Sequence, residues 1–463
     1  MDFFDVVVIG GGSAGYAAAS KAQSNGAKVA IIDRGPLGGL CILRGCMPTK
    51  AILRSSNVLA LIHRAKEFGL SVSSPSADLS LINDRKTRLI KKFASYRIKQ
   101  LNDPKFKLIE EHASFLSPNK IKVGELVLSA KNFIIATGST VADFPIPGLS
   151  EAGFFTSDDL LELRETPESM VVLGAGPVAV ELAQFFCRIG TKTTLIQRSD
   201  YILSKGDEDL ARPVEKRFRE EGMEVYTGTK LLRVEKSRDG RTIIFSHKGI
   251  EKSVTASIIL QALGRKPNIN GLNLPAASVN IDQGRIAVDQ EMRTNIPHIF
   301  AVGDVNGLHE IVHIAIEQGE IAAHNATQKD LRQFDERLKI SITFTDPPVA
   351  SVGLSEKECK ESNIIYLKAS YPFDDHGKSL CMGETHGHVK LLCSPSNGEI
   401  IGAHVVGPEA GEMIHQMVSL MFFRGTVHDL IKLPYYHPTL SEIFTYPAEE
   451  LLKKLCLLSI KEI

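Results

Sequence analysis

Two cysteines five positions apart, Cys41 and Cys46, are the residues of this 463-residue chain whose spacing most clearly indicates chemistry. On a regular helix such residues lie about 140° apart around the axis and about 8 Å apart along it. A disulfide needs Cα atoms within about 7 Å, so a bridge here requires an irregular helix start. Gly38, Gly39 and Gly45 supply the backbone freedom for one.

A bridge that closes so small a loop adds little stability, so it makes more sense as a redox device than as a structural cross-link. A zinc site would need further Cys or His ligands at short spacing, and none lies nearby in the sequence, so we predict no metal. Two buried free thiols remain an alternative. We interpret the five scattered cysteines as small buried side chains: Cys187, Cys359, Cys381, Cys393 and Cys456.

A glycine-rich turn precedes the cysteine pair. The largely apolar residues 5–9 (DVVVI) predict a strand, and the sequence GGGSAG at 10–15 predicts a turn. The Ala-rich stretch that follows predicts a helix, and the largely apolar residues 27–32 (AKVAII) predict a second strand. Glycines in this pattern allow a tight turn and a close backbone approach to a pyrophosphate, and an acid at the second strand's end can bind ribose hydroxyls. The candidate cofactor contacts are Gly10, Gly12, Ser13, Ala14, Gly15, Asp33 and Arg34.

The same pattern returns between residues 170 and 196, which predicts a second dinucleotide-binding unit. Its strand end carries Gln197 and Arg198 in place of an acid. A carboxylate would repel the 2′-phosphate of NADPH, whereas Arg can pair with it, so the pattern favours NADPH over NADH. A solvated surface charge is the alternative for Arg198. The candidate contacts are Gly174, Gly176, Ala179, Gln197 and Arg198.

Composition narrows the class of protein. Lys+Arg and Asp+Glu both number 54, so the net charge is zero and a nucleic-acid or membrane-surface partner is not expected. No apolar run approaches the roughly 20 residues that span a bilayer. The first residues lack the basic region of a signal peptide, so we expect a cytoplasmic protein.

After about residue 336 the pattern changes. Residues 349–352, 389–392 and 400–406 predict strands of an antiparallel sheet, and residues 412–423 predict a helix. We interpret this region as a separate α+β domain.

Taken together, the chain resembles the pyridine nucleotide–disulfide oxidoreductases with a Cys-x4-Cys centre, among them dihydrolipoyl dehydrogenase, glutathione reductase and mercuric reductase. Besides the motifs above, the resemblance rests on residues 134–138 (IIATG), 261–268 (QALGRKPN), 299–304 (IFAVGD) and 343–354. It implies an α/β fold with two Rossmann-like domains that bind FAD and NAD(P), plus a C-terminal α+β dimerisation domain. The implied segments are 1–148 and 269–335 for FAD, 149–268 for NAD(P) and 336–463 for the interface. Further implied cofactor contacts are Gly39, Lys50, Thr137, Gly138, Gly264, Arg265, Gly303 and Asp304.

The resemblance also assigns catalytic roles. Cys46 is the flavin-proximal thiol and Cys41 the interchange thiol, while His437, oriented by Glu442, moves the proton across the interface of a homodimer. A His⁺ beside a thiol favours the reactive thiolate. Glu442 also fits a capping box with Thr439. Lys50 and Glu181 match an ion pair beside the flavin, although from sequence alone they would pass for an exposed helix residue and a surface charge.

Some positions depart from the family pattern and leave the substrate open: Leu40, Leu43, Arg44, Pro177 and Tyr435. The sequence around His437 is closest to that of lipoamide enzymes, whereas Gln197 and Arg198 indicate an NADPH-driven reductase. Mercuric reductases carry a C-terminal cysteine pair, and this chain has only Cys456 there. A diaphorase or transhydrogenase without disulfide chemistry is the further alternative. Arg44, between the cysteines, is either a charge that tunes the thiols or a solvated helix residue.

Overall fold

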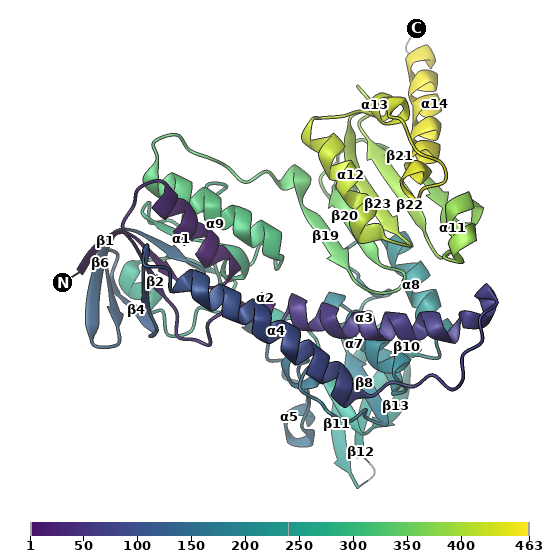
Figure 1. Cartoon of the computed structure of the whole chain (residues 1–463), viewed down its shortest axis with the longest axis horizontal. Helices are drawn as coiled ribbons and strands as arrows, with labels where there is room; N and C mark the ends of the chain where they lie inside the picture. Colours follow the sequence, from purple (N-terminus) through teal and green to yellow (C-terminus); the bar gives the residue numbers. More distant parts are fainter. Residues whose placement is uncertain (1, 239, 462–463) are drawn as a thin grey trace. The chain divides into compact units, whose positions relative to one another are not determined.

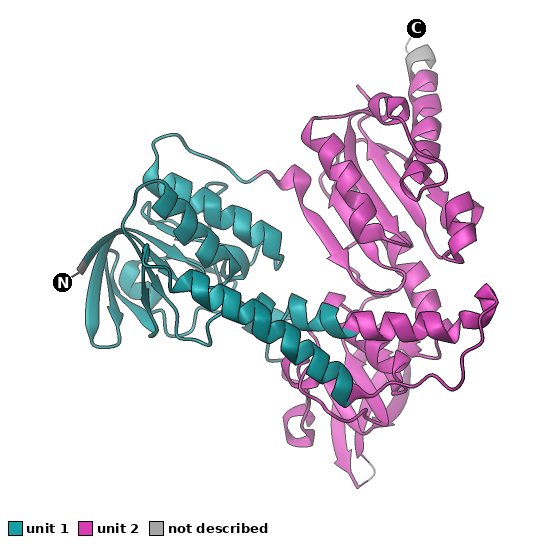
Figure 2. Cartoon of the chain, viewed as in Figure 1, with its two compact units in different colours: residues 1–52, 80–144, 264–334 teal, residues 53–79, 145–263, 335–463 magenta. Residues whose placement is uncertain are grey.

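The computed structural model describes residues 2–238 and 240–461. The chain forms two compact units, each assembled from separate stretches of sequence (Figure 2). Unit 1 comprises residues 1–52, 80–144 and 264–334, and unit 2 comprises residues 53–79, 145–263 and 335–463. Unit 2 contains both the second glycine motif and the C-terminal sheet, which the sequence assigns to separate domains. The predicted division into four segments therefore stays a prediction.

Unit 1 is built on a seven-stranded sheet in the order β3-β2-β1-β6-β5-β4, with β18 beside β6. The strands β1, β2, β3, β6 and β18 are parallel where they pair, as their continuous apolar sequence predicts. Helices α1 and α9 lie side by side against this sheet (Figure 1). The bounds are β1 Asp2–Ile9, α1 Ser13–Ser24, β2 Val29–Ile32, β3 Phe106–Ile109, β4 Ala113–Ser117, β5 Lys120–Val123, β6 Leu126–Ile135, β18 Ile299–Ala301 and α9 Val312–Thr327.

Three helices follow the first βαβ motif. The short α2 (Gly39–Leu43) leads into α3 (Cys46–His63), and α4 (Leu79–Leu101) follows after a loop (Figure 1). A small antiparallel pair, β7 (Ser139–Val141) with β15 (Arg265–Pro267), joins the two segments that leave and re-enter unit 1.

Unit 2 contains the second parallel sheet, in the order β10-β9-β8-β14, and a three-stranded antiparallel sheet, β11-β12-β13. The glycine motif lies between β8 and α7, as the sequence predicts. The bounds are β8 Ser169–Leu173, α7 Pro177–Arg188, β9 Lys192–Ile196, α8 Glu208–Glu220, β10 Glu224–Tyr226, β11 Thr229–Ser237, β12 Gly240–His247, β13 Ile250–Ala256 and β14 Ile258–Gln261.

The C-terminal part of unit 2 is a five-stranded antiparallel sheet in the order β19-β20-β23-β22-β21, which confirms the predicted α+β region. Helix α12 packs on β20 and β23, and α14 packs on β21. The bounds are β19 Ile340–Thr343, β20 Val349–Gly353, α10 Glu356–Glu361, β21 Leu367–Pro372, α11 Gly377–Met382, β22 His388–Cys393, β23 Ile400–Val406, α12 Ala410–Phe422, α13 Val427–Lys432, the 3-10 turn η6 Ser441–Phe444 and α14 Thr445–Lys461. Within the described ranges, every helix is too short or too polar to cross a membrane.

Candidate active site

The cysteine pair lies where one helix stops and the next begins. Cys41 belongs to α2, which ends when Arg44 turns to φ −143°, and Cys46 is the first residue of α3. A Cβ on Gly45 would lie 3.0 Å from the carbonyl oxygen of Leu40, so the link between the helices favours glycine. The irregular backbone that the five-residue spacing requires is therefore present.

The two thiols contact each other. Cys41 is half-buried and Cys46 is exposed. The hydrogen bond between the thiols, followed by burial, raises the pKa of Cys41 well above its usual range. Because only a thiolate attacks a disulfide, Cys41 needs a base that takes its proton.

The first glycine motif forms an open cradle at the start of α1. Gly10 adopts φ +110°, and Gly12 precedes the helix without any side-chain cap. A Cβ on Gly39 would lie 2.6 Å from the Cα of Gly12, so these backbones pass each other at a distance that only glycine allows. The uncapped N–H groups of the first turn fit the pyrophosphate of a dinucleotide such as FAD.

Two backbone N–H groups orient the carboxylate of Asp33, the residue after β2. Asp33 accepts the N–H of Gly11 on Oδ2 at 2.6 Å and the N–H of Gly35 on Oδ1 at 2.8 Å. Each carboxylate oxygen has a further lone pair, so the group can still accept hydrogen bonds from ribose hydroxyls. Arg34, beside it, is exposed, whereas Ala14 of the glycine motif is buried.

A second acid of unit 1, Asp304, follows β18. Its Oδ2 accepts the hydroxyl of Ser139 at 2.6 Å, and Arg265 donates to the same hydroxyl oxygen at 2.8 Å. Thr137, close by in sequence, donates its hydroxyl to the carbonyl of Asn268 at 2.7 Å. The sequence analysis missed Ser139, although it directly follows the IIATG motif. Gly138, Gly264 and Gly303, predicted contacts in these segments, all adopt positive φ.

The second glycine motif repeats the cradle in unit 2. Gly174 adopts φ +101°, a Cβ on Gly176 would meet no atom within 4 Å, and α7 begins without a side-chain cap. After β9, Gln197 donates to the hydroxyl of Ser204 at 3.5 Å, and Arg198 is exposed. The arrangement fits a second dinucleotide, with an accessible cation beyond the strand end.

Lys50 lies half-buried on α3, in unit 1. Glu181 lies on α7, in unit 2, and is 3% exposed. Its Oε1 accepts the N–H of Phe344 at 2.9 Å. From sequence alone Glu181 would pass for a surface charge, and that interpretation is wrong. The pairing of Glu181 with Lys50 stays a prediction.

The predicted His–Glu pair forms. Nδ1 of His437 lies 3.1 Å from Oε2 of Glu442, and the two side chains are 79% and 15% exposed. Oε1 of Glu442 accepts the N–H of Thr439 at 3.2 Å, which is the carboxylate half of the predicted capping box. The other half is wrong, because η6 begins at Ser441 with Leu440 at its N-cap and no side-chain cap.

Tyr435, which stands two residues before His437, is half-buried. Its hydroxyl accepts a hydrogen bond from Gln416 on α12 at 2.7 Å, and burial raises its pKa. Pro177 occupies the first position of α7, where its missing N–H costs nothing.

Known proteins match most of this chain in sequence. The family description "Pyridine nucleotide-disulphide oxidoreductase" matches residues 4–319, and the dimerisation domain of the same family matches residues 340–448. Mercuric reductase of Staphylococcus aureus is 34% identical over 92% of this chain and 78% of its own length. Dihydrolipoyl dehydrogenase of Bacillus subtilis is 34% identical over 94% of this chain and 96% of its own length.

Among solved structures, the HOCl-induced flavoprotein disulfide reductase RclA from Escherichia coli superimposes with a TM-score of 0.84 at 24% identity. The match covers 96% of this chain and 99% of that one. It confirms the predicted fold class.

Proposed function

We propose that this chain, which belongs to the pyridine nucleotide–disulfide oxidoreductases, exchanges electrons between a nicotinamide nucleotide and an external disulfide of the lipoamide type. The observation that carries the proposal is the His437–Glu442 pair, which supplies the base that the Cys41 thiol requires. The first glycine cradle, Asp33 and Asp304 would hold FAD, which would supply hydride acceptance and two-electron transfer to the cysteine pair.

The protein residues then perform a thiol–disulfide exchange. His437 takes the proton of Cys41, and the resulting thiolate attacks one sulfur of the substrate disulfide. The substrate S–S bond breaks, a mixed disulfide with Cys41 forms, and the leaving thiolate receives the proton from His437. Cys46 then loses its proton to His437 and attacks the sulfur of Cys41 as a thiolate. The bond between Cys41 and the substrate breaks, the bridge re-forms, and the second substrate sulfur leaves as a thiolate that receives that proton.

Glu442 supports both proton transfers. Its carboxylate on Nδ1 leaves Nε2 of His437 to accept and return the proton, and it stabilises the imidazolium in between. Because His437 is 79% exposed on a single chain and the dimerisation domain matches residues 340–448, we place the pair at the site of a partner subunit in a homodimer.

Mercuric ion is the second candidate substrate, favoured by the 34% identity to mercuric reductase. The same identity links the chain to dihydrolipoyl dehydrogenase, so identity does not separate the two. The retained His437 and the single cysteine after Cys393, Cys456, favour the disulfide. For the nucleotide, the exposed Arg198 after β9 supports NADPH over NADH, because it can pair with a 2′-phosphate.

The test is a comparison of lipoamide, glutathione disulfide and mercuric ion as electron acceptors, each with NADPH and with NADH. We expect the highest kcat/KM with lipoamide and NADPH. Cys46→Ser and His437→Gln should each lower lipoamide reduction about 100-fold or more, while the flavin is still reduced by NADPH. Preference for mercuric ion, or a Cys46→Ser enzyme that reduces lipoamide like the wild type, would refute the proposal.

A further inference from the structure

A second histidine lies on the buried side of Glu442. His376, at the start of α11, is 1% exposed, and its ring lies edge-on to the rings of Phe373 and Tyr446, with centroids 6.5 and 6.4 Å away. It comes 61 positions before His437, so neither spacing nor motif connects the two in the sequence. The fold places it behind the carboxylate that His437 faces.

The two ring nitrogens of His376 have different surroundings. Nδ1 lies 2.9 Å from the hydroxyl oxygen of Ser379, which is itself fully buried. Nε2 is buried without a hydrogen-bond partner in the part of the chain that the structure describes, and it lies 3.6 Å from Oε1 of Glu442. The two atoms are thus just beyond hydrogen-bond length, and a closing movement of a few tenths of an ångström would bring them within it.

The surroundings decide which nitrogen carries the proton. If Nδ1 were protonated in the neutral ring, the lone pair of Nε2 would face the carboxylate, which is repulsive. If the hydroxyl of Ser379 donates to Nδ1, Nε2–H points at Glu442 instead. The carboxylate of Glu442 therefore favours the tautomer with the proton on Nε2, and the Ser379 hydroxyl can stabilise it by donating to Nδ1.

We propose that His376 is a positioning residue that holds Glu442 from behind, so that Glu442 stands between two imidazoles and keeps His437 oriented for proton transfer. The inference rests on the proposed role of His437 in disulfide exchange. With His376 closing on Oε1, the carboxylate is fixed by Thr439 N–H and His376 on one oxygen and by His437 on the other.

A purely structural role explains the residue less well. Two of the neighbours of His376 are aromatic rings, and an apolar ring would keep these packing contacts without the cost of burying an imidazole. His376 keeps a polar nitrogen directed at a catalytic carboxylate.

His376 acts as a neutral donor near neutral pH. Burial lowers its pKa, and the positive form of His437 acts in the same direction, while the charge of Glu442 opposes both. The other titratable groups around the ring are the phenols of Tyr446 and Tyr371, which stack on each other. Asp375 accepts the Tyr371 hydroxyl at 2.8 Å. In acid, a protonated His376 would compete with His437 for Glu442, so it should contribute to the acidic limb of the pH profile.

The test compares His376→Phe and His376→Gln with the wild-type FAD-loaded dimer, with lipoamide as the probe. Phe keeps the ring and removes the donor, whereas the Gln amide can place a donor near the position of Nε2. We expect His376→Phe to lower kcat/KM for lipoamide about 10-fold or more and to change the acidic limb. His376→Gln should recover most of the loss, and the rate of flavin reduction by NADPH should not change.

A second readout needs no substrate. In the reduced enzyme, the rate at which iodoacetamide alkylates Cys41 should fall in His376→Phe, with a changed pH dependence. If His376→Phe does not fold, Ser379→Ala replaces it and should show the same defect through loss of the hydroxyl that stabilises this tautomer.

Two patterns of results separate the inference from the proposed function. If His437→Gln is strongly impaired but His376→Phe, or Ser379→Ala in its place, stays within about twofold of the wild type with the same pH profile, the positioning role is refuted alone. If His437→Gln also reduces lipoamide like the wild type, the proposed function fails first.

Discussion

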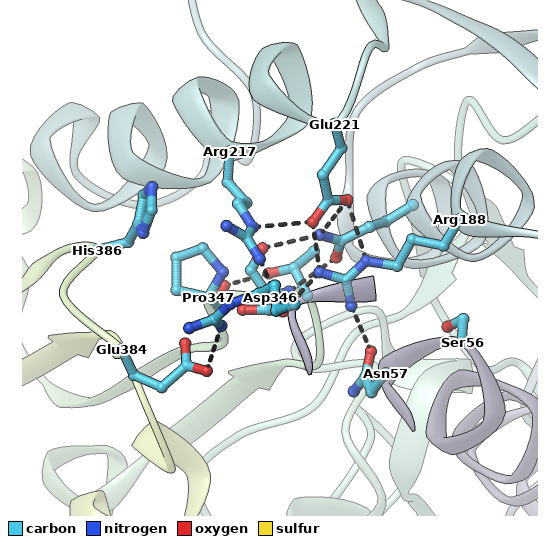
Figure 3. A network of polar contacts seen from close by, with 12 residues as sticks. Ser56, Asn57, Arg188, Arg217, Glu221, Asp346, Pro347, Glu384 and His386 are labelled. Atoms are coloured by element: carbon cyan, nitrogen blue, oxygen red, sulfur yellow. Dashed lines mark hydrogen bonds and ion pairs between the residues drawn. The ribbon is translucent and has the colours of Figure 1, made fainter. Parts of the chain in front are cut away.

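A buried arginine in unit 2 offers a strong test of how this fold is held together. Arg188, at the end of α7, has a side chain that is 4% exposed. It lies 2.5 Å from both Glu221 and Asp346, and it donates to the side-chain oxygen of Asn57 at 2.7 Å (Figure 3). These three partners come from three separate stretches of the chain, so the Arg188 side chain connects its own helix, α7, with α3, the end of α8 and the segment before β20.

The magnitude follows from what remains when Arg188 is replaced by Met. Glu221 keeps Arg217 at 2.9 Å, but Asp346 retains only the same Arg217 at 3.8 Å, so one cation must serve two carboxylates. Removing one partner of a buried ion pair costs about 3–5 kcal/mol. Because Arg217 compensates in part, we expect the lower end, about 3 kcal/mol, which corresponds to a fall of about 3–5 °C in the apparent unfolding temperature.

The measurement is thermal unfolding of the FAD-loaded enzyme at fixed protein and FAD concentration. Arg233→Met is the matched control, because Arg233 forms an exposed ion pair with Glu235 at 2.8 Å in the same unit. Exposed pairs contribute about 0–1 kcal/mol, so this control should shift the unfolding temperature by about 2 °C or less. Equal shifts in the two variants would show that the buried network does not contribute as argued.

Two further predictions concern the flavin cradle and a buried lysine. Gly39→Ala places a Cβ 2.6 Å from the Cα of Gly12 and should lower the FAD-to-protein ratio of the purified enzyme, whereas Gly26→Ala, at a similar positive φ but in open space, should not; equal FAD content would contradict the cradle. Lys390, 1% exposed, lies within 3.1 Å of three carboxylates. Burial alone would raise the pKa of Asp207 and Asp209. Lys390 at Asp207, and His388 together with Lys390 at Asp209, outweigh burial and hold the pKa of both carboxyl groups below their ordinary values. Stability from such lowered pKa values is present above about pH 4 and is lost as the pH falls through them. Lys390→Met should therefore unfold at a lower temperature at pH 7 and lose less stability than the wild type on acidification, and parallel melting curves against pH would contradict this.

The elements that sequence reasoning predicted are those specified by neighbouring residues. Residues 6–9 and 170–173 are continuous apolar runs, and they form the buried parts of the parallel strands β1 and β8. The bend between Cys41 and Cys46 followed from helix geometry alone. Local periodicity and local sterics are sufficient for such features, because the interacting atoms are a few positions apart.

The features that sequence reasoning missed join residues that are distant in the chain. Glu181 reads as a surface charge, yet it is buried against Phe344. His376 lies in an unremarkable acidic stretch, and only the turn after β21 brings it to Glu442. Glu221 likewise stands in a run of charges and becomes a buried ion-pair partner only through Arg188. A charged residue carries no sign of its partner until the topology is known.

The unequal exposure of His437 and Glu442 bears on whether the chain works as a dimer. A solvent-exposed ion pair is weak and screened, so it would orient an imidazole poorly. In this chain the carboxylate is 15% exposed and supported from behind, while the imidazole is 79% exposed. This difference in exposure is what we expect of an imidazole that its own subunit holds at one end and that a partner subunit covers at the other. The match of residues 340–448 to a dimerisation domain supports the proposal that a partner subunit provides that cover. On that proposal, dimer formation and competence for disulfide exchange should be lost together.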